Sequence, residues 1–342
     1  MRAVLQHGIR EVRLAKLPEP KPGPGEVLLR TRAVTLCASD LHIYAEGNIG
    51  GVSWDRPFVP GHEASAVIED PNGFDFSPGA PVVMDPAVPC RSCEMCAAGS
   101  FHLCLDLKFC DLPPVDGAMQ ELMAWPADRV YALPASVDIV EAPLIEPLCV
   151  AIHALELAPD LRGARVSIAG CGAIGLFTLQ MARLRGAGRI FVTDPIPERL
   201  AVAKELGADV TVQVGPQEAA AEILRATDGG GVEVAFEAAG PPEALEQCLE
   251  VVRPGGTVIV IGIPSDDEYR LQASHLRRRE LTLRFVRRQN ENFREAIGLV
   301  AENRLRLSPL LTHRFPVERA REAFDLADRK AEGAVRVAVT FD

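Results

Sequence analysis

Four cysteines lie close together in one segment of the chain, with the spacing C-x2-C-x2-C-x7-C. They are Cys90, Cys93, Cys96 and Cys104. Four thiolates at this spacing suit one tetrahedral zinc ion, and a site closed by four protein ligands leaves no position for a substrate. The spacing therefore predicts a structural zinc site with no direct part in turnover. An iron–sulfur cluster uses related spacings and is the alternative occupant.

A second group of candidate metal ligands is scattered over the first part of the chain. Cys37 follows a β-type run, His62 and Glu63 are adjacent, and Glu146 comes much later. A thiolate, an imidazole and a carboxylate can hold zinc and leave its fourth position open, as catalytic zinc requires. Each residue alone has a structural alternative, because a lone Cys after a strand is usually a core residue and a His-Glu pair usually lies on the surface. Together they predict a catalytic metal site.

A glycine-rich loop, G-x-G-x-x-G, stands between a β-type run (RVSIAG) and a helical stretch. In this context the first glycine permits a tight turn, the second lets the backbone approach a pyrophosphate, and the third lets helix and strand pack closely. The helix N-terminus favours the negative charge of the pyrophosphate. The loop therefore predicts a dinucleotide site. Its expected contacts are Gly170, Gly172, Ala173, Ile174 and Gly175.

An acidic residue stands at the end of the next expected strand. Asp194 lies 19 residues after Gly175, where a carboxylate can accept hydrogen bonds from the adenosine ribose and repel a 2′-phosphate. This arrangement favours NAD over NADP. Two alternatives remain open: Asp194 could be a turn residue before Pro195, and Arg199 is close enough in sequence to assist a phosphate.

The chain changes character near residue 148. Before that point it is rich in Pro, Gly and short β-type runs, such as residues 26–35, 64–68 and 81–84, which predicts a β-rich domain. Afterwards six apolar runs alternate with helical stretches, which predicts a doubly wound parallel sheet with helices on both faces. The last stretch is expected to rejoin the first domain. The predicted domains are therefore residues 1–148 with 287–342, and residues 149–286.

The expected elements of the second domain follow from this alternation. The strands are residues 165–170, 189–194, 209–214, 232–237, 257–262 and 281–286. The helices are residues 174–184, 197–206, 217–227 and 242–252.

The composition excludes several classes of protein. With 342 residues, 48% hydrophobic residues and a net charge of −11, the chain has an ordinary globular composition and lacks the basic balance of a nucleic-acid binder. The start of the chain has no apolar signal region, and no run of eighteen apolar residues suggests a membrane span. Nine cysteines without an export signal favour metal ligation over disulfides. We therefore expect a cytoplasmic protein without nucleic-acid or membrane partners.

The sequence resembles the zinc-containing medium-chain dehydrogenase/reductase family over nearly its whole length, and within it the sorbitol and xylitol (polyol) dehydrogenase branch. The resemblance implies an α/β two-domain fold, with a β-rich GroES-like catalytic domain and a Rossmann domain that binds NAD. The segments that carry the resemblance are Gly61-His62-Glu63, the four-cysteine segment, Glu146-Pro147-Leu148 with His153, the glycine loop with Asp194, Phe109-Cys110, Pro113-Pro114 with Asp116-Gly117, and Thr312-His313-Arg314-Phe315.

The resemblance also implies roles for individual residues. Cys37 and His62 would ligate the catalytic zinc, with Glu63 as the carboxylate ligand of the polyol branch. Glu146 would contact the metal directly or through its water. Ser39 and His42 fall where the family keeps a hydroxyl and a proton-relay imidazole. Besides Glu146, the suppliers of contacts to substrate hydroxyls are expected to be Tyr44 and Arg288.

The expected function is NAD-linked oxidation of a secondary alcohol of a polyol to a ketose, with two zinc ions per chain. Relatives form dimers or tetramers, which predicts a homodimer or homotetramer, and residues 257–262 are a candidate edge strand for assembly. Threonine 3-dehydrogenase and butanediol dehydrogenase use the same machinery and are the alternatives within the family. A dinucleotide-binding module without catalysis is the alternative of another class.

Overall fold

A computed structural model describes residues 1–214 and 219–342. The chain forms two compact units, the first made of Met1–Glu146 with Asn290–Asp342 and the second of Pro147–Gln289. These boundaries differ by two or three residues from those expected, because helix α3 (Ile145–Leu157) runs across the first of them. No helix among the described residues is both long and apolar enough to span a bilayer.

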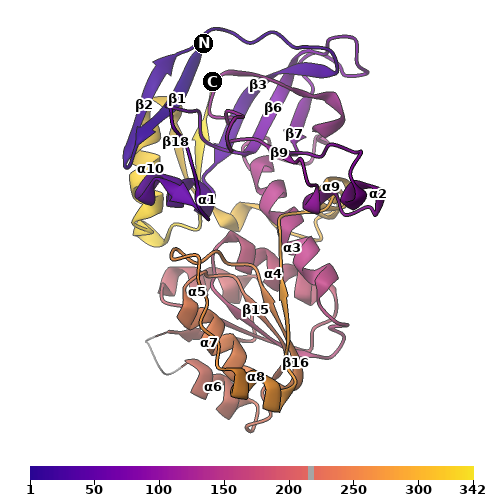
Figure 1. The fold of residues 1–342 in the computed structure, drawn as a ribbon, viewed down its shortest axis with the longest axis vertical. Coiled ribbons are helices and arrows are strands. Elements are labelled where there is room, and N and C mark those ends of the chain that lie inside the picture. Colours follow the sequence, from indigo (N-terminus) through magenta and orange to yellow (C-terminus); the bar gives the residue numbers. More distant parts are fainter. Residues whose placement is uncertain (215–218) are drawn as a thin grey trace. The chain divides into compact units, whose positions relative to one another are not determined.

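The first unit is built on a seven-stranded sheet with the order β11-β7-β6-β3-β19-β18, in which β10 also pairs with β3. Burial alternates along most of β3, as expected for a strand with one face on the core. The C-terminal β19 pairs antiparallel with β3, and Figure 1 accordingly draws yellow strands among the indigo and purple ones of this unit. The strands are β3 (Glu26–Thr35), β6 (Glu63–Asp70), β7 (Pro81–Met84), β10 (Leu122–Pro126), β11 (Val130–Ala132), β18 (Leu311–Pro316) and β19 (Arg336–Thr340).

Shorter elements surround this sheet. Helix α10 presents Ala320, Ala323, Phe324 and Ala327 to the core, a spacing that places them on one face of a helix. The other strands are β1 (Arg2–Gly8), β2 (Glu11–Lys16), β4 (Asn48–Ile49), β5 (Val52–Ser53), β8 (Ala87–Val88) and β9 (Lys108–Phe109). The helices are α1 (Ala38–Glu46), α2 (Glu94–Ala97), α9 (Phe293–Ala301) and α10 (Ala320–Asp328), with 3-10 turns at Phe101–Leu103, Ala127–Arg129, Ala142–Leu144, Ser308–Leu310, Val317–Arg319 and Ala331–Gly333.

The second unit is a six-stranded parallel sheet with the order β14-β13-β12-β15-β16-β17. This is the doubly wound order, in which the chain starts in the middle and builds outward in both directions. All six expected strands are present. One expectation was wrong: residues 257–262 do not form an edge, because β16 lies between β15 and β17. The strands are β12 (Arg165–Ala169), β13 (Arg189–Asp194), β14 (Val210–Gln213), β15 (Val232–Glu237), β16 (Val252–Val260) and β17 (Thr282–Phe285).

Helices cover both faces of this sheet. The crossovers from β12 to β14 and from β15 to β17 run in opposite directions, so right-handed connections put their helices on opposite faces. Four helices were expected, and residues 217 and 218 of one of them lie outside the described residues. The helices are α4 (Ala173–Leu184), α5 (Pro197–Glu205), α6 (Ala219–Ala226), α7 (Pro242–Val251) and α8 (Ala273–Arg279).

Candidate active site and dinucleotide site

Cys37 is placed by the start of α1. It is the N-cap residue, with extended backbone angles. The Asp40 carboxylate accepts a 2.7 Å hydrogen bond from the Cys37 N–H and a 3.1 Å bond from the Gly61 N–H. One buried carboxylate thereby fixes both Cys37 and the residue before His62. Burial first, and then the nearby Asp111, raise the pKa of Asp40 well above its usual range.

His62 and Glu63 are placed by the start of β6. Gly61 has a φ of +92°, and a Cβ there would lie 2.7 Å from the Val34 side chain, so the turn requires glycine. Glu63 then pairs with Thr35 of β3 in the sheet register. Since Cys37 follows the same end of β3, the pairing brings both segments to one place.

The ligand atoms of Cys37, His62 and Glu63 all lie within 4.8 Å of one another. Sulfur, imidazole nitrogen and carboxylate oxygen are donors that zinc accepts, at ligand distances of about 2.0–2.3 Å. His62 and Glu63 are buried, while Cys37 is half-buried. The three side chains therefore fit a zinc ion that keeps one position for a further ligand.

Further side chains hold these ligands in place. Asp111 accepts a 2.7 Å hydrogen bond from Nδ1 of His62, which leaves Nε2 for a metal. Burial lowers the pKa of His62, but Asp111 and Cys37 raise it more, so the net shift is well upward. Arg336 donates a 2.8 Å hydrogen bond to one Glu63 oxygen, and the Thr35 hydroxyl donates to the other. The buried charge of Glu63 is thereby compensated.

Glu146 lies in the first turn of α3, outside the group of three. Its side chain is buried. Burial, with Glu63 as the nearby negative charge, raises the pKa of Glu146 to about 7, although His62 opposes the shift. A carboxyl group with this pKa can accept or donate a proton near neutral pH.

Two of the three other candidates on α1 keep partly exposed side chains. Ser39 and His42 are half-buried and stand three residues apart, on the same helix face. His42 lies 3.5 Å from Glu46. The expectation for Tyr44 was wrong. Its side chain is fully buried in the core, its ring lies 5.0 Å from Phe324 and its hydroxyl donates a 2.7 Å hydrogen bond to Asp325.

The four cysteines of the other cluster also converge. The sulfur atoms of Cys90, Cys93, Cys96 and Cys104 lie within 4.8 Å of one another, as a tetrahedral metal site needs. Hydrogen bonds from Ser92, both side chain and backbone, lower the pKa of Cys90 to about 6, which favours the thiolate that binds metal.

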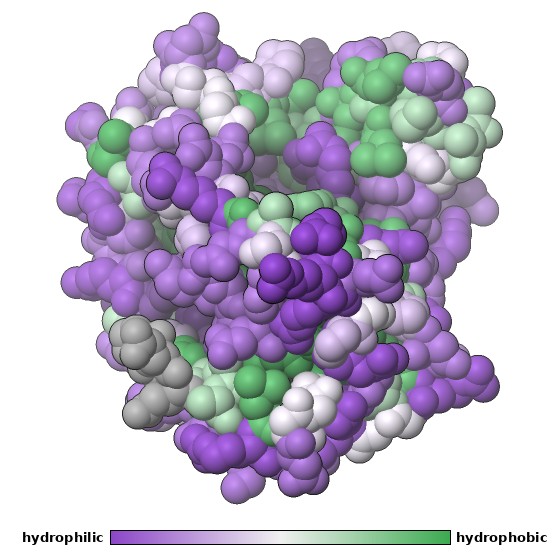
Figure 2. All heavy atoms as spheres, turned by 60° about the horizontal axis from the view of Figure 1, so that its bottom comes forward, coloured by the Kyte–Doolittle hydropathy of each residue, from purple (hydrophilic) through white to green (hydrophobic). Residues whose placement is uncertain are grey.

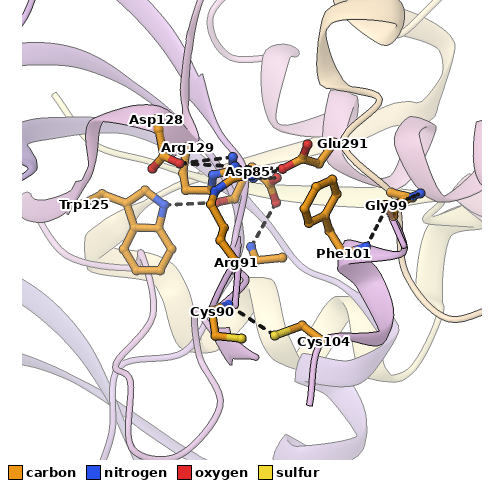
Figure 3. A network of polar contacts seen from close by, with 12 residues as sticks. Asp85, Cys90, Arg91, Gly99, Phe101, Cys104, Trp125, Asp128, Arg129 and Glu291 are labelled. Carbon is orange, nitrogen blue, oxygen red and sulfur yellow. Dashed lines mark hydrogen bonds and ion pairs between the residues drawn. The ribbon is translucent and has the colours of Figure 1, made fainter. Parts of the chain in front are cut away.

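A polar network anchors this cysteine segment to the rest of the first unit (Figure 3). The side chains of Arg91 and Arg129 point toward Glu291, at 2.9 Å and 3.0 Å. Arg129 is buried and also lies 3.3 Å from Asp85. Asn290 adds hydrogen bonds to the backbone of Gly99 and Phe101. The cysteine segment is therefore held by Asn290 and Glu291, the first two residues after the chain returns to the first unit.

The glycine loop of the second unit has the geometry of a phosphate site. Gly172 is the N-cap of α4, and a Cβ added there would meet nothing within 4 Å. Gly170 has a φ of +102°, and a Cβ on Gly175 would lie 1.9 Å from the Gly170 oxygen. The first and third glycines are thus required by the fold. The second borders open space at the N-terminal turn formed by Ala173 and Ile174, where an anion can approach backbone N–H groups.

Asp194 is buried at the end of β13 beside this loop. Its carboxylate accepts hydrogen bonds from Cys171 N–H at 2.7 Å and Ile196 N–H at 2.9 Å, so it fixes the loop. It also lines a pocket of about 400 Å³. Three further carboxylates, all on α7, line the pocket, and none of its described lining residues is Lys or Arg. They are Glu243, Glu246 and Glu250.

Comparisons with known proteins agree with this geometry. Residues 23–135 match the alcohol dehydrogenase GroES-like domain family, and residues 173–302 match the zinc-binding dehydrogenase family. Sorbitol dehydrogenase of Bacillus subtilis is 36% identical over 329 residues, which cover 96% of this chain and 93% of the relative. That of Gallus gallus is 38% identical over 332 residues, with 96% and 93% covered.

The chain belongs to the zinc-containing medium-chain dehydrogenase/reductase family, in its polyol dehydrogenase branch. Solved structures support the fold of this dehydrogenase. A Sinorhizobium meliloti protein described as a zinc-binding dehydrogenase and bound to NADP has a TM-score of 0.90 and 27% identity, with 99% of both chains covered. The 2R,3R-butanediol dehydrogenase of Bacillus subtilis has a TM-score of 0.88 and 26% identity, with 100% and 99% covered. The chain is an alcohol or polyol dehydrogenase that uses zinc and a nicotinamide dinucleotide.

Two predicted site residues of the dehydrogenase lie in the second unit, away from these clusters in sequence. Arg199 is half-buried on α5. Burial first, and then Asp194, raise the pKa of Cys171, and the charge of Arg199 opposes this shift. Arg288 has a φ of +56° and is half-buried just before the chain leaves the second unit. Their roles stay predictions.

Several residues that hold the dehydrogenase site were missed from the sequence. Asp40 had a local signal, because Cys37-x-x-Asp40 has the spacing of a helix capping box. Asp111 and Arg336 had none, since they meet His62 and Glu63 from 49 and 273 residues away.

Proposed function

We propose that this dehydrogenase oxidises a secondary alcohol of a polyol, of the sorbitol or xylitol type, to the ketose with NAD. The observation that carries the proposal is the group of Cys37, His62 and Glu63, whose ligand atoms lie within 4.8 Å. The full-length similarity to sorbitol dehydrogenases supports the choice of polyol over simpler alcohols.

Cys37, His62 and Glu63 would hold the catalytic zinc, and Glu146 would contact the metal directly or through its water. When bound, zinc lowers the pKa of an alcohol hydroxyl and stabilises its deprotonated form. Ser39 would accept the hydroxyl proton and pass it toward His42 and solvent. Glu146, with a pKa of about 7, suits a part in this proton movement. The nicotinamide ring of the cofactor, which the glycine loop of the second unit would help to hold, would supply the acceptor for the hydride from the alcohol carbon.

Glu146 and Arg288 are the proposed contacts to substrate hydroxyls. A polyol needs several partners, since a buried hydroxyl left unpaired costs about 1–3 kcal/mol. Tyr44 is not among the proposed contacts, because its hydroxyl donates a hydrogen bond to Asp325.

NAD rather than NADP is the proposed cofactor. The four carboxylates around the pocket, with no Lys or Arg among its described lining residues, would repel a 2′-phosphate. Asp194 keeps acceptor capacity for ribose hydroxyls, because each carboxylate oxygen can accept two hydrogen bonds. Arg199 would assist the cofactor from α5. The test is the ratio of the dissociation constants of NADH and NADPH, and equal affinity would contradict the proposal.

We propose a second, structural zinc at the cysteine cluster, which makes two per chain. Metal analysis of wild-type protein, Cys37→Ser and Cys93→Ser tests both sites together. The expected zinc contents are two, one and one, with activity lost in Cys37→Ser. The same measurement applies to His62→Ala. Wild-type turnover in either catalytic-site variant would refute the ligand assignment.

The alternatives within the family are threonine 3-dehydrogenase and butanediol dehydrogenase, the latter supported by a similar structure. Steady-state NAD reduction with sorbitol, xylitol, ribitol, threonine and butanediol separates them. The polyol proposal fails if threonine or butanediol gives the highest kcat/KM. Retention of Cys37, His62 and Glu63 in one group argues against a module without catalysis.

The cytoplasm is the proposed location, because none of the nine cysteines forms a disulfide, and thiols persist as metal ligands most readily in a reducing compartment. We also propose a homodimer or homotetramer. Strand β17 is one of the two edges of the parallel sheet, and in the described part of the chain no strand pairs with its outer side, which a second copy could use.

A further inference from the structure

A buried carboxylate joins two loops at the carboxyl edge of the parallel sheet. Glu237, the last residue of β15, has no exposed surface. One of its oxygens accepts hydrogen bonds from the N–H groups of Ala239 and Gly240, both at 2.7 Å. The other accepts the N–H of Gly262, from the loop after β16, at 3.1 Å. Among the described residues Glu237 makes no ion pair, so backbone N–H groups alone stabilise its charge.

The two loops meet backbone to backbone around this side chain. A Cβ on Gly262 would lie 2.4 Å from the Gly240 nitrogen and 2.5 Å from a Glu237 oxygen. A Cβ on Gly240, which has a φ of +102°, would lie 2.7 Å from the Ile263 oxygen. A side chain at either glycine would therefore collide with the facing loop. Glu237 therefore sets the spacing of the two loops.

The other half of the sheet uses the same device. There Asp194, at the end of β13, accepts the N–H of Cys171 in the loop after the neighbouring β12. In each half a buried carboxylate at the end of one strand thus ties down the loop of its neighbour. A doubly wound sheet consists of two mononucleotide-binding halves, and the glycine loop marks the half of β12 to β14 as the adenosine side. The half of β15 to β17 is then the nicotinamide side.

We propose that Glu237 is a positioning residue for the nicotinamide half of the cofactor, which it serves by holding the loop at residues 261–264 in place. The loop at residues 238–241, whose Ala239 and Pro241 line the pocket beside Asp194, is also held by a 2.9 Å hydrogen bond from the Ala238 N–H to the Ala169 oxygen. The inference rests on the proposed NAD-linked function. A Gln side chain keeps the shape of Glu, but its NH2 group would face the Gly262 N–H or the other two N–H groups. The amide oxygen keeps two hydrogen bonds if it faces Ala239 and Gly240, and the NH2 group then faces Gly262. Glu237→Gln should therefore loosen the loop at residues 261–264 without removing the side chain.

The test compares two ligands that differ in the nicotinamide ring. Dissociation constants of NADH and ADP-ribose are measured for wild-type protein and Glu237→Gln. We expect NADH to bind about tenfold more weakly, as for the loss of one charged hydrogen bond, and ADP-ribose within about twofold of wild type. Glu233→Gln is the control, because Glu233 lies at the other end of β15 and pairs with Arg165. Both affinities should be unchanged in the control.

The outcomes separate this inference from the proposed function. Wild-type protein that binds neither ligand overturns both. Wild-type protein that binds NADH, with equal changes for the two ligands in Glu237→Gln, overturns the inference alone. If Glu237→Gln does not fold, hydrogen exchange of the wild-type protein decides. NADH must then slow exchange at residues 261–264 more than ADP-ribose does, and equal protection by the two ligands refutes the inference.

Discussion

At the scale of single residues, the candidate metal site depends as much on the side chains around the ligands as on the ligands. Cys37, His62 and Glu63 could be recognised in the sequence because a known pattern of residues surrounds them. Asp111 and Arg336 could not, because only the folded chain brings them to His62 and Glu63. Both are buried partners of a buried group, so their loss leaves a polar atom without its hydrogen bond.

Asp111→Ala should weaken metal binding at Cys37 and His62 by about 10–100-fold, because a partner that orients a ligating histidine typically contributes that much. Zinc competition with a chelator measures the affinity, with the metal of the four cysteines as internal reference. Asp116→Ala is the control, since Asp116 lies in the same loop but bonds to Val59 and Arg56 instead. Unchanged affinity in Asp111→Ala would contradict the positioning role.

In protein freed of metal, Arg336→Met should lower the free energy of unfolding by about 3–5 kcal/mol, because it leaves the buried Glu63 carboxylate without its guanidinium partner. Arg30→Met removes a pair with Glu69 that is more than a third exposed on both sides. That pair should contribute only about 0–1 kcal/mol. Urea unfolding of both variants makes the comparison, and equal losses would show that the Arg336 pair contributes no more than a surface pair.

At the scale of elements, local patterns predicted what each segment is but not where it lies. The alternation of apolar runs and helices identified all six strands of the second unit, because the apolar run that marks each strand is a local feature of the sequence. The order of strands depends on crossovers, which is why residues 257–262 were wrongly expected at the edge that β17 occupies. The prediction that Tyr44 contacts substrate was wrong for a related reason. The direction of its side chain depends on how α1 packs against α10, where Tyr44 meets Phe324 and Asp325.

The glycine loop permits a prediction that separates folding from binding. Gly175→Ala should lower the free energy of unfolding by about 1–3 kcal/mol, because its Cβ would lie 1.9 Å from the Gly170 oxygen. Gly172→Ala meets nothing within 4 Å and keeps a φ of −68°, so stability should be unchanged or rise by up to about 1 kcal/mol. NADH affinity should nevertheless fall about tenfold or more in Gly172→Ala, because the methyl group stands where the pyrophosphate approaches.

Thermal or urea unfolding and NADH titration of the two variants provide the test. A Gly172→Ala protein that binds NADH as tightly as wild type would show that the pyrophosphate does not approach the second glycine. A Gly175→Ala protein of wild-type stability would show that the loop has room to relax.

At the scale of the whole molecule, the candidate metal sites and the candidate dinucleotide site lie in different units. The first holds both cysteine-containing clusters, and the second holds the glycine loop and the acidic pocket. On the face shown in Figure 2, hydrophilic residues dominate and hydrophobic ones form separate patches. Among the described residues, exposed large hydrophobic side chains occur in both units, including Phe285 on β17 and Phe74 in the first unit.

The proposed homo-oligomer gives these two phenylalanines different expected roles. Phe285 is 58% exposed at the end of β17, and its ring lies 6.2 Å from that of Tyr269. Within the described residues, β17 pairs with β16 on one side and with no strand on the other. Phe74 is 40% exposed in a loop of the first unit. If β17 pairs with a second copy, Phe285→Glu places a charge in the buried interface and should shift the protein toward smaller species, whereas Phe74→Glu should not. Sedimentation equilibrium measures the result. A monomeric wild-type protein would refute the oligomer, and an oligomer unaffected by Phe285→Glu would place its interface elsewhere.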